Sequence, residues 1–172
     1  MSAGLTRATL VLGGARSGKT RHGMALAEAA ASERLYIATA QAFDDEMADR
    51  IARHKAERGA GWSTLEAPVE ITEGIRGATG VVLVDCLTLW LSNLMHAERD
   101  IADATTDLLE AIRASRATVV LVSNEVGLGI VPETPLGRAF RDAQGRLNQD
   151  VAAAVGQVQF VAAGLPLTLK RS

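Results

Sequence analysis

Five short apolar segments, spread along the whole chain, constrain most strongly how this sequence can fold. Each is rich in β-branched residues and nearly free of polar ones, which is typical of strands buried on both faces of a parallel sheet. Segments with helical periodicity lie between them. The sequence therefore predicts an α/β fold in which helices flank a mostly parallel sheet. The expected strands are residues 8–12, 34–38, 81–86, 118–123 and 158–162, and the expected helices are residues 18–31, 44–58, 87–97, 101–115 and 135–155.

The remaining segments add one strand and one irregular region. The tail LPLTLK, which follows Gly164, predicts a short antiparallel strand at the edge of the sheet. Residues 59–80 form the least regular part of the sequence. A chain of 172 residues without internal repeats or a clear linker is expected to form one domain, spanning residues 1–172.

A glycine-rich motif, GGARSGKT, lies where the first expected strand ends and the first expected helix begins. It fits the pattern G-x-x-x-x-G-K-[ST] of phosphate-binding loops. Its glycines let backbone N–H groups curl around an anion, and the following helix directs its positive end at the same place. We therefore expect a nucleoside triphosphate here. The predicted nucleotide-binding residues are Gly13, Gly14, Ala15, Arg16, Ser17, Gly18, Lys19 and Thr20.

Two side chains of this loop have specific expected roles. Lys19 can reach the β and γ phosphates, and the Thr20 hydroxyl is placed to ligate Mg²⁺. We expect Lys19 to face the ligand rather than pack in the core, so that its loss removes activity and spares the fold. The alternative interpretation is a glycine-rich turn between a strand and a helix that binds nothing.

The residues that follow the other strands are informative because ligands of open α/β sheets bind beyond the carboxyl ends of the strands. Asp85 closes the third expected strand, in the arrangement by which P-loop proteins hold Mg²⁺ through a carboxylate. Asn124 and Glu125 follow the fourth strand, and their role stays open between the site and a polar turn. The residues predicted to contact the nucleotide from these strand ends are Thr39, Ala40, Gln41 and Asp85.

Composition indicates which kinds of partner the protein binds and in which cellular compartment it works. A formal net charge of −2, with basic residues dispersed along the chain, disfavours nucleic-acid binding. Cys86 is the only cysteine, so we expect no internal disulfide, a packing role for the thiol and a reducing cytoplasmic setting. The N-terminal residues lack the pattern of a signal peptide, and no apolar run approaches the roughly 18 residues that span a bilayer.

Residues 43–62 predict a helix with a basic and histidine-bearing face. Phe43, Met47 and Ile51 recur at four-residue spacing, and the stripe continues to His54. Arg50 and Arg58 lie one turn to either side of His54. A single histidine on a helix is usually structural or exposed, but an imidazole flanked by arginines can also be a nucleophile that faces an anion. The pattern alone leaves both interpretations open.

Taken together, four segments of the chain resemble one known family. They are GGARSGKTRH, YIATAQAFDDEMADRIARHKAER, VLVDCLTLWLSNLM and LVSNEVGLGIVPETPLGRAFRDAQGRLNQ. The first alone indicates only a P-loop protein, whereas the combination is specific. The sequence is similar to the bifunctional adenosylcobinamide kinases and adenosylcobinamide-phosphate guanylyltransferases of cobalamin biosynthesis, from about residue 9 to residue 170. The resemblance implies a P-loop NTPase-type, RecA-like domain.

The resemblance also implies two reactions and their residues. A nucleoside triphosphate, ATP or GTP, phosphorylates adenosylcobinamide, and GTP then donates GMP to that phosphate through a guanylylated histidine, which matches His54. Pyrophosphate and adenosylcobinamide-GDP are the products. The resemblance further implies Mg²⁺ dependence and a homotrimer. This chain departs mildly from the family pattern at two positions, with Thr20 where serine is common and Asp85 where some relatives carry glutamate. The residues it assigns to the guanine nucleotide are Lys55, Arg58, Glu66 and Asp85.

Two other functional classes remain compatible with the residues. A simple P-loop kinase for a small metabolite would phosphorylate its substrate and carry no covalent nucleotide. A nucleotide-responsive binding module would bind GTP tightly without turning over a corrinoid.

The segment LTLWLSNLM raises a separate question about assembly. It carries Trp90, Leu91, Leu94 and Met95, more apolar bulk than a helix covering one sheet face needs. One interpretation is that part of it meets another subunit, and the alternative is ordinary core packing.

Overall fold

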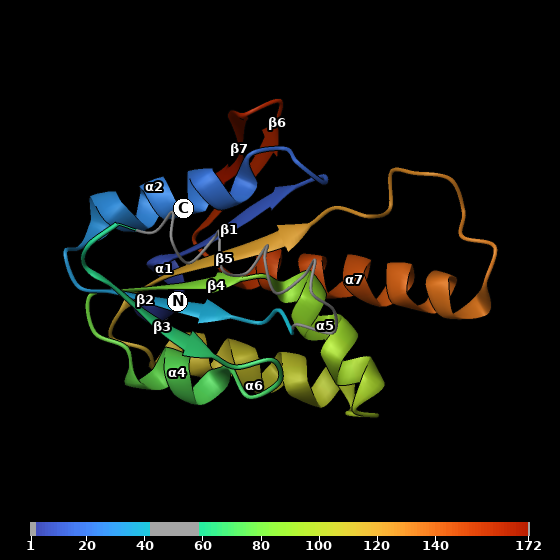
Figure 1. Cartoon of the computed structure of the whole chain (residues 1–172), viewed down its shortest axis with the longest axis horizontal. Helices are drawn as coiled ribbons and strands as arrows, with labels where there is room; N and C mark the ends of the chain where they lie inside the picture. The colour runs from blue at the N-terminus through green and yellow to red at the C-terminus, as the bar shows by residue number, and fades with distance from the viewer. Residues whose placement is uncertain (1–2, 42–58, 172) are drawn as a thin grey trace.

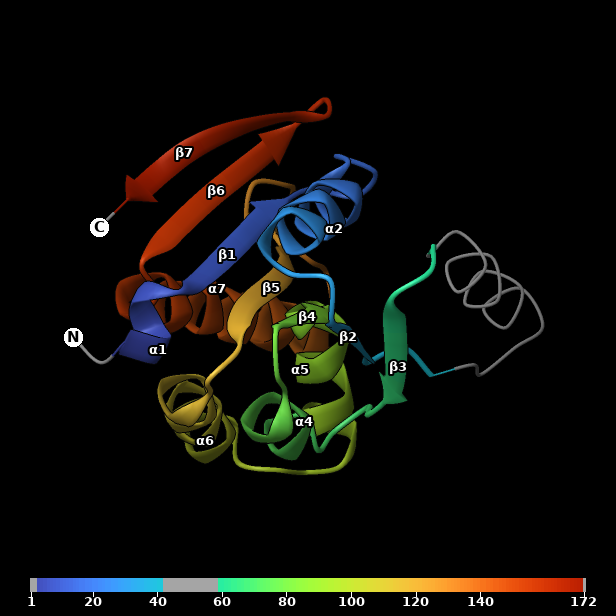
Figure 2. The ribbon, with the colours of Figure 1, turned by 90° about the vertical axis from the view of Figure 1, so that its left-hand side faces the viewer.

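A seven-stranded sheet forms the centre of the molecule (Figure 1). The computed structural model describes residues 3–41 and 59–171. The strand order is β3-β2-β4-β5-β1-β6-β7, and all neighbours are parallel except the antiparallel pair β6 and β7. Figure 2 shows the β6–β7 pair at one end of the sheet and β3 at the other. The strands are β1 (Ala8–Gly13), β2 (Arg34–Ala38), β3 (Trp62–Glu66), β4 (Val81–Asp85), β5 (Thr118–Asn124), β6 (Gln157–Ala162) and β7 (Leu165–Arg171).

Helices cover both faces of the sheet. The helix α2 (Lys19–Ala30) lies on one face, and α4 (Thr72–Gly77), α5 (Leu87–His96), α6 (Ile101–Ala114) and α7 (Pro135–Ala154) lie on the other (Figure 1). A short helix, α1 (Ala3–Thr6), precedes β1. Val11 packs on the α2 face, whereas its neighbours Leu10 and Leu12 belong to the opposite core. Because alternate residues fill two separate cores, the central strands are apolar throughout.

The predicted elements agree closely with the structure wherever the sheet is buried. The five expected strands and four of the expected helices are confirmed within one residue at each end. The predicted edge strand is confirmed as β7, antiparallel to β6. The expected helix at residues 44–58 lies outside the described residues. No helix among the described residues has both the length and the apolar content needed to cross a membrane.

Residues 59–80, which have no regular pattern in the sequence, contain β3 and α4. The strand β3 pairs with β2 alone and lies at the edge of the sheet. Its residues are at best half-buried, so its sequence WSTLE lacks the apolar run that marks the central strands. The helix α4 has six residues, too few for a helical period to emerge.

The apolar residues of α5 are core residues. Trp90, Leu91 and Leu94 expose 2%, 0% and 1% of their surface, and the Trp90 indole donates to the Val69 carbonyl at 2.8 Å. Met95 packs against the same core. The core-packing alternative is therefore confirmed for Trp90, Leu91 and Leu94. Met95 is only partly buried, and a subunit contact by part of the segment stays a prediction. The helix has this much apolar bulk because it packs against α6 and α7 as well as against the sheet.

Candidate nucleotide-binding site

The carboxyl ends of five parallel strands bring the predicted site residues to one edge of the sheet (Figure 1). Gly13 at the end of β1 pairs with Asn124 of β5. Asp85 at the end of β4 pairs with Val122 on the other side of β5. One strand therefore separates the glycine-rich loop from Asp85, which places the two strand ends roughly 10 Å apart. Glu66 ends β3 at the same edge, in register with Ala38.

The glycine-rich loop folds tightly between β1 and α2. The Ser17 N–H donates to the Gly14 carbonyl at 3.2 Å, and the Gly164 N–H donates to the Ser17 carbonyl at 2.8 Å. A Cβ atom at Gly13 would lie 2.5 Å from Ser17 Oγ, so no larger residue fits there. Gly18 has φ of 93°, a left-handed conformation in which glycine is strongly preferred. Gly13 is thus required by close approach and Gly18 by backbone conformation.

Lys19 is buried, with 9% of its surface exposed, and its Nζ donates to the Gly14 carbonyl at 3.0 Å. The side chain is therefore more enclosed than expected, and its contact with a ligand stays a prediction. The reason for the enclosure is that α2 begins at Lys19 itself, inside the curl of the loop, so the loop backbone encloses the side chain.

The Ser17 hydroxyl indicates what the loop can hold. Its Oγ is buried and has no hydrogen-bond partner within the described part of the chain. A buried hydroxyl without a partner is costly unless it bonds to a ligand or water. The loop therefore combines a buried hydroxyl, a lysine ammonium and the amino end of α2, which is a set of groups that fits a phosphate.

The donor set also fits Mg²⁺ as it accompanies a nucleotide. Thr20 lies in the first turn of α2, and Asp85 is partly exposed at the end of β4. Among the described residues, no three His, Cys, Asp or Glu side chains form a group that could hold a metal alone. One hydroxyl and one carboxylate are typical of Mg²⁺, which takes its other ligands from phosphates and water.

Buried polar residues fix the position of Asp85. The Tyr36 hydroxyl donates to Asp85 Oδ2 at 2.6 Å, and Tyr36 is only 5% exposed. The fully buried Thr39 uses its hydroxyl to accept from the Cys86 N–H and to donate to the Cys86 carbonyl, both at 2.8 Å. Its N–H also bonds to the Asp85 carbonyl at 3.1 Å. Tyr36 was not among the predicted site residues, although a hydroxyl within an apolar strand is the signal that could have revealed it.

Cys86 packs beside the site, as the sequence predicts. Burial, reinforced by the negative charge of Asp85, raises the pKa of the Cys86 thiol to about 11, although the Lys19 ammonium acts in the opposite direction. The thiol is therefore protonated at neutral pH. Because the thiolate is the nucleophilic form, Cys86 is unsuited to covalent catalysis.

A buried polar cluster, Ser123, Gln144 and Asn148, fixes the end of β5. The Ser123 hydroxyl donates to Asn148 Oδ1 at 2.7 Å, and Gln144 Nε2 donates to the same atom at 3.0 Å. Asn148 in turn donates from Nδ2 to the Asn124 carbonyl at 3.0 Å. This cluster was not predicted from the sequence, and its signal is two amides four residues apart on the buried face of α7. The cluster fixes the strand end next to the glycine-rich loop.

Comparison with known proteins agrees with this geometry. The model of a family described as cobinamide kinase / cobinamide phosphate guanyltransferase matches residues 9–169, nearly the whole chain. The chain belongs to this family. It is accordingly an enzyme of the cobinamide kinase and cobinamide phosphate guanyltransferase class.

Three relatives of the cobinamide kinase family match along nearly their whole lengths. The bifunctional adenosylcobalamin biosynthesis protein CobP of Pseudomonas aeruginosa is 45% identical, over 94% of this chain and 96% of its own. The corresponding proteins named CobU are 43% identical in Salmonella typhimurium and 42% identical in Escherichia coli, each over 94% of this chain and 98% of the relative.

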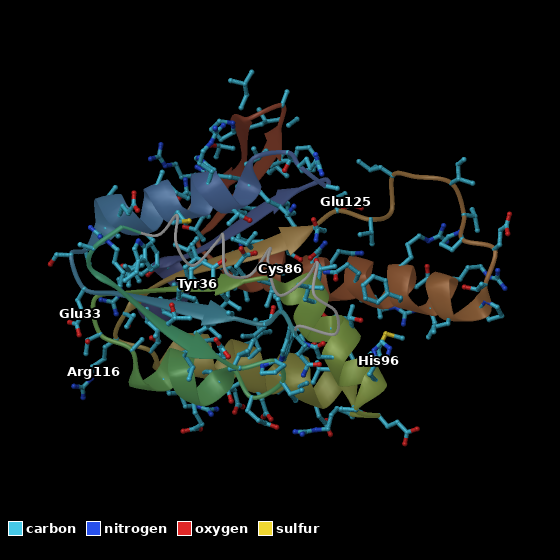
Figure 3. All side chains as sticks on the ribbon, in the orientation of Figure 1. Glu33, Tyr36, Cys86, His96, Arg116 and Glu125 are labelled. Atoms are coloured by element: carbon cyan, nitrogen blue, oxygen red, sulfur yellow. The ribbon has the colours of Figure 1, made fainter. Side chains whose placement is uncertain are left out.

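The structure brings together most of the site residues predicted for this family member. The loop residues and Asp85 converge at the edge described above, and Ala40 and Gln41 follow β2 there. Glu125, labelled in Figure 3, bonds through its N–H to the Gly13 carbonyl at 3.1 Å. The predicted residues His54, Lys55 and Arg58 lie outside the described residues.

Proposed function

We propose that this protein catalyses both reactions for which its family is named, on adenosylcobinamide and its phosphate. The observation that carries the proposal is the convergence of the glycine-rich loop and Asp85 at one sheet edge. In the first reaction, a nucleoside triphosphate phosphorylates the hydroxyl of adenosylcobinamide. In the second, GTP transfers GMP to the new phosphate, and the products are adenosylcobinamide-GDP and pyrophosphate.

For the kinase step, the loop supplies position and positive charge. The hydroxyl oxygen of the substrate attacks the γ phosphorus and loses its proton, and the bond to the β–γ bridging oxygen breaks. Lys19 and Arg16 stabilise the charge that develops on the phosphate oxygens, which is the main contribution proteins make to phosphoryl transfer. Thr20 and Asp85 would hold Mg²⁺, which neutralises phosphate charge when bound.

For the guanylyl transfer, we assign His54 as the nucleophile. A ring nitrogen attacks the α phosphorus of GTP, the bond to the bridging oxygen breaks, and pyrophosphate leaves. A phosphate oxygen of the corrinoid then attacks the same phosphorus and releases the imidazole. Two displacements replace one difficult transfer. Lys55, Arg58 and Glu66 would contact the nucleotide, and support for these roles comes from the sequence resemblance.

The products formed from a corrinoid substrate test this proposal. The protein is incubated with adenosylcobinamide, GTP or ATP, and Mg²⁺. The corrinoids are then separated, and their masses are measured by mass spectrometry. We expect adenosylcobinamide phosphate and then adenosylcobinamide-GDP. A phosphate without the GDP product would favour a simple kinase. Tight GTP binding with neither product would favour a nucleotide-responsive module, and both results would contradict the proposal.

Replacing Tyr36 with phenylalanine is expected to weaken metal binding by about tenfold, since partners that orient a metal ligand have effects of this size. The change removes only the hydroxyl that donates to Asp85 Oδ2 and keeps the ring that packs edge-on against Trp62 at 6.0 Å. Mn²⁺ binding in the presence of GTP, followed by electron paramagnetic resonance, measures the affinity directly. Trp62→Phe is the control, because it changes the ring contact and retains the hydroxyl. Equal Mn²⁺ affinities in Tyr36→Phe and wild type would contradict the role of Tyr36.

We further propose that residues 1–172 act as one domain and assemble into a homotrimer in the cytoplasm. The family resemblance supports the trimer, and the single cysteine supports the reducing compartment. Light scattering with nucleotide present should give three times the chain mass of 18.1 kDa. A monomeric mass at working concentration would count against the trimer.

A further inference from the structure

The connection between β5 and α7, residues 125–134, exposes an unusual group of apolar side chains. Leu128, Ile130 and Val131 are 83%, 98% and 58% exposed, and Leu136 in the first turn of α7 is 65% exposed. Figure 1 shows this loop extending away from the sheet before it returns to α7. Apolar residues gathered on an exposed segment commonly mark a binding surface.

Hydrogen bonds hold both ends of this loop. At the first end, the Glu125 N–H donates to the Gly13 carbonyl, and Glu125 Oε1 accepts from the Gly127 N–H at 2.6 Å. At the second end, Arg138 Nη1 donates to the Pro132 and Glu133 carbonyls at 3.0 and 2.8 Å. The exposed side chains therefore project from a connection anchored to β1 and α7.

The base of the loop lies beside the phosphate site. It leaves β5, the strand that pairs with β1, at the point where Gly13 and Asn124 are in register. Figure 3 places Glu125 at the base of the loop, at the end of β5. The Ser123, Gln144 and Asn148 cluster fixes that same strand end from the α7 side. A molecule bound to the loop can therefore reach the glycine-rich loop with a flexible arm.

We propose that this loop binds the corrinoid macrocycle, with Leu128, Ile130 and Val131 packed against it. The inference rests on the proposed function, because that function makes a corrinoid the acceptor. A corrin ring is broad, bears methyl groups and carries uncharged amide arms, and its reacting hydroxyl stands on a side arm. Residues 126–132 contain no charged side chain, which suits such a surface. Ligand sites are mostly apolar with a few polar groups, as this loop and its anchors are.

A second copy of the chain is the competing occupant. A stable interface buries roughly 800 Å² on each partner. Three or four side chains on one extended loop offer a narrow surface by comparison, whereas a flat macrocycle matches it in scale. The surface is therefore assigned to the substrate.

The test compares corrinoid affinity in two matched double variants. Leu128→Ser with Ile130→Ser removes the exposed apolar side chains of the loop. Leu167→Ser with Leu169→Ser removes side chains that are 62% and 57% exposed on β7. Adenosylcobinamide binding is measured by equilibrium dialysis, from the visible absorbance of the corrin ring, with a non-hydrolysable GTP analogue present. We expect the dissociation constant for the corrinoid to rise at least tenfold in the loop variant only, with an unchanged constant for the analogue.

The possible outcomes distinguish a failure of the loop assignment from a failure of the proposed function. An unchanged corrinoid constant in the loop variant, or an equal rise in the β7 variant, would overturn the assignment. A lower molar mass of the loop variant by light scattering, with weaker binding of both ligands, would assign the loop to subunit contact and also overturn it. Failure of the wild-type protein to bind adenosylcobinamide would reject the proposed function itself.

Discussion

Replacing His54 with alanine is expected to abolish the covalent attachment of GMP to this protein. The proposed intermediate is a phosphoramidate between an imidazole nitrogen and the α phosphorus of GTP. Intact-mass measurement after incubation with GTP and Mg²⁺ should show the GMP adduct on the wild type and none on His54→Ala. The bond should survive base and break in acid, because a protonated imidazole is a good leaving group.

The other two histidines are matched controls for this experiment. His22 Nε2 lies 2.5 Å from Gln159 Oε1, and His96 Nδ1 lies 2.7 Å from the Ser92 carbonyl oxygen. Each ring therefore has a hydrogen-bond partner in the fold, and we expect variants of either histidine to remain labelled. Phosphorylation of adenosylcobinamide does not use the nucleophile and should persist in His54→Ala. Label from [α-³²P]GTP that stays on folded His54→Ala, or maps to another residue, would refute the assignment.

Removing the Lys19 ammonium should reduce both reactions by about 100-fold or more, the size of effect seen when a donor to a developing charge is lost. Because Lys19 is 9% exposed, alanine would also remove the packing of its methylene stem. Lys19→Met retains most of that stem and loses the charge. We therefore expect Lys19→Met and Lys19→Ala to be equally inactive, with Lys19→Met the more stable to urea.

The hydrogen bond from Lys19 to the Gly14 carbonyl sets the expected stability cost. Losing one such bond should lower the free energy of unfolding by about 1 kcal/mol, which leaves a folded protein. Arg21→Ala is the control for charge, since Arg21 is an exposed cation two residues further along α2. Corrinoid phosphorylation at the wild-type rate by folded Lys19→Met would contradict the role of the ammonium.

The sequence predicts the fold well where burial leaves a local pattern. The central strands β1, β2, β4 and β5 are apolar because each has neighbours on both edges and helices on both faces. Their boundaries follow from that pattern alone. The edge strand β3 lacks these constraints, so its polar residues gave no signal and its position emerged only from pairing with β2.

Within the candidate site, too, contacts between individual residues that are distant in sequence could not be predicted from local pattern. The motif predicts that Lys19 lies at the phosphates, but its burial depends on how the loop closes over the start of α2. Tyr36 meets Asp85 across 49 residues of sequence, and Ser123 meets Asn148 across 25. Contacts of this kind depend on strand order and helix placement, which residue spacing does not contain.

The position of β1 in the sheet has a consequence for the order of synthesis. Its two neighbours are β5 and β6, which lie more than a hundred residues later in the chain. The turn after β6 supplies the Gly164 N–H that bonds to the Ser17 carbonyl at 2.8 Å. Chains are synthesised from the amino end, so β1 and its loop are made long before β5 and β6, the strands with which β1 pairs. A nascent chain on the ribosome therefore has no completed nucleotide site until residues 157–171 have emerged.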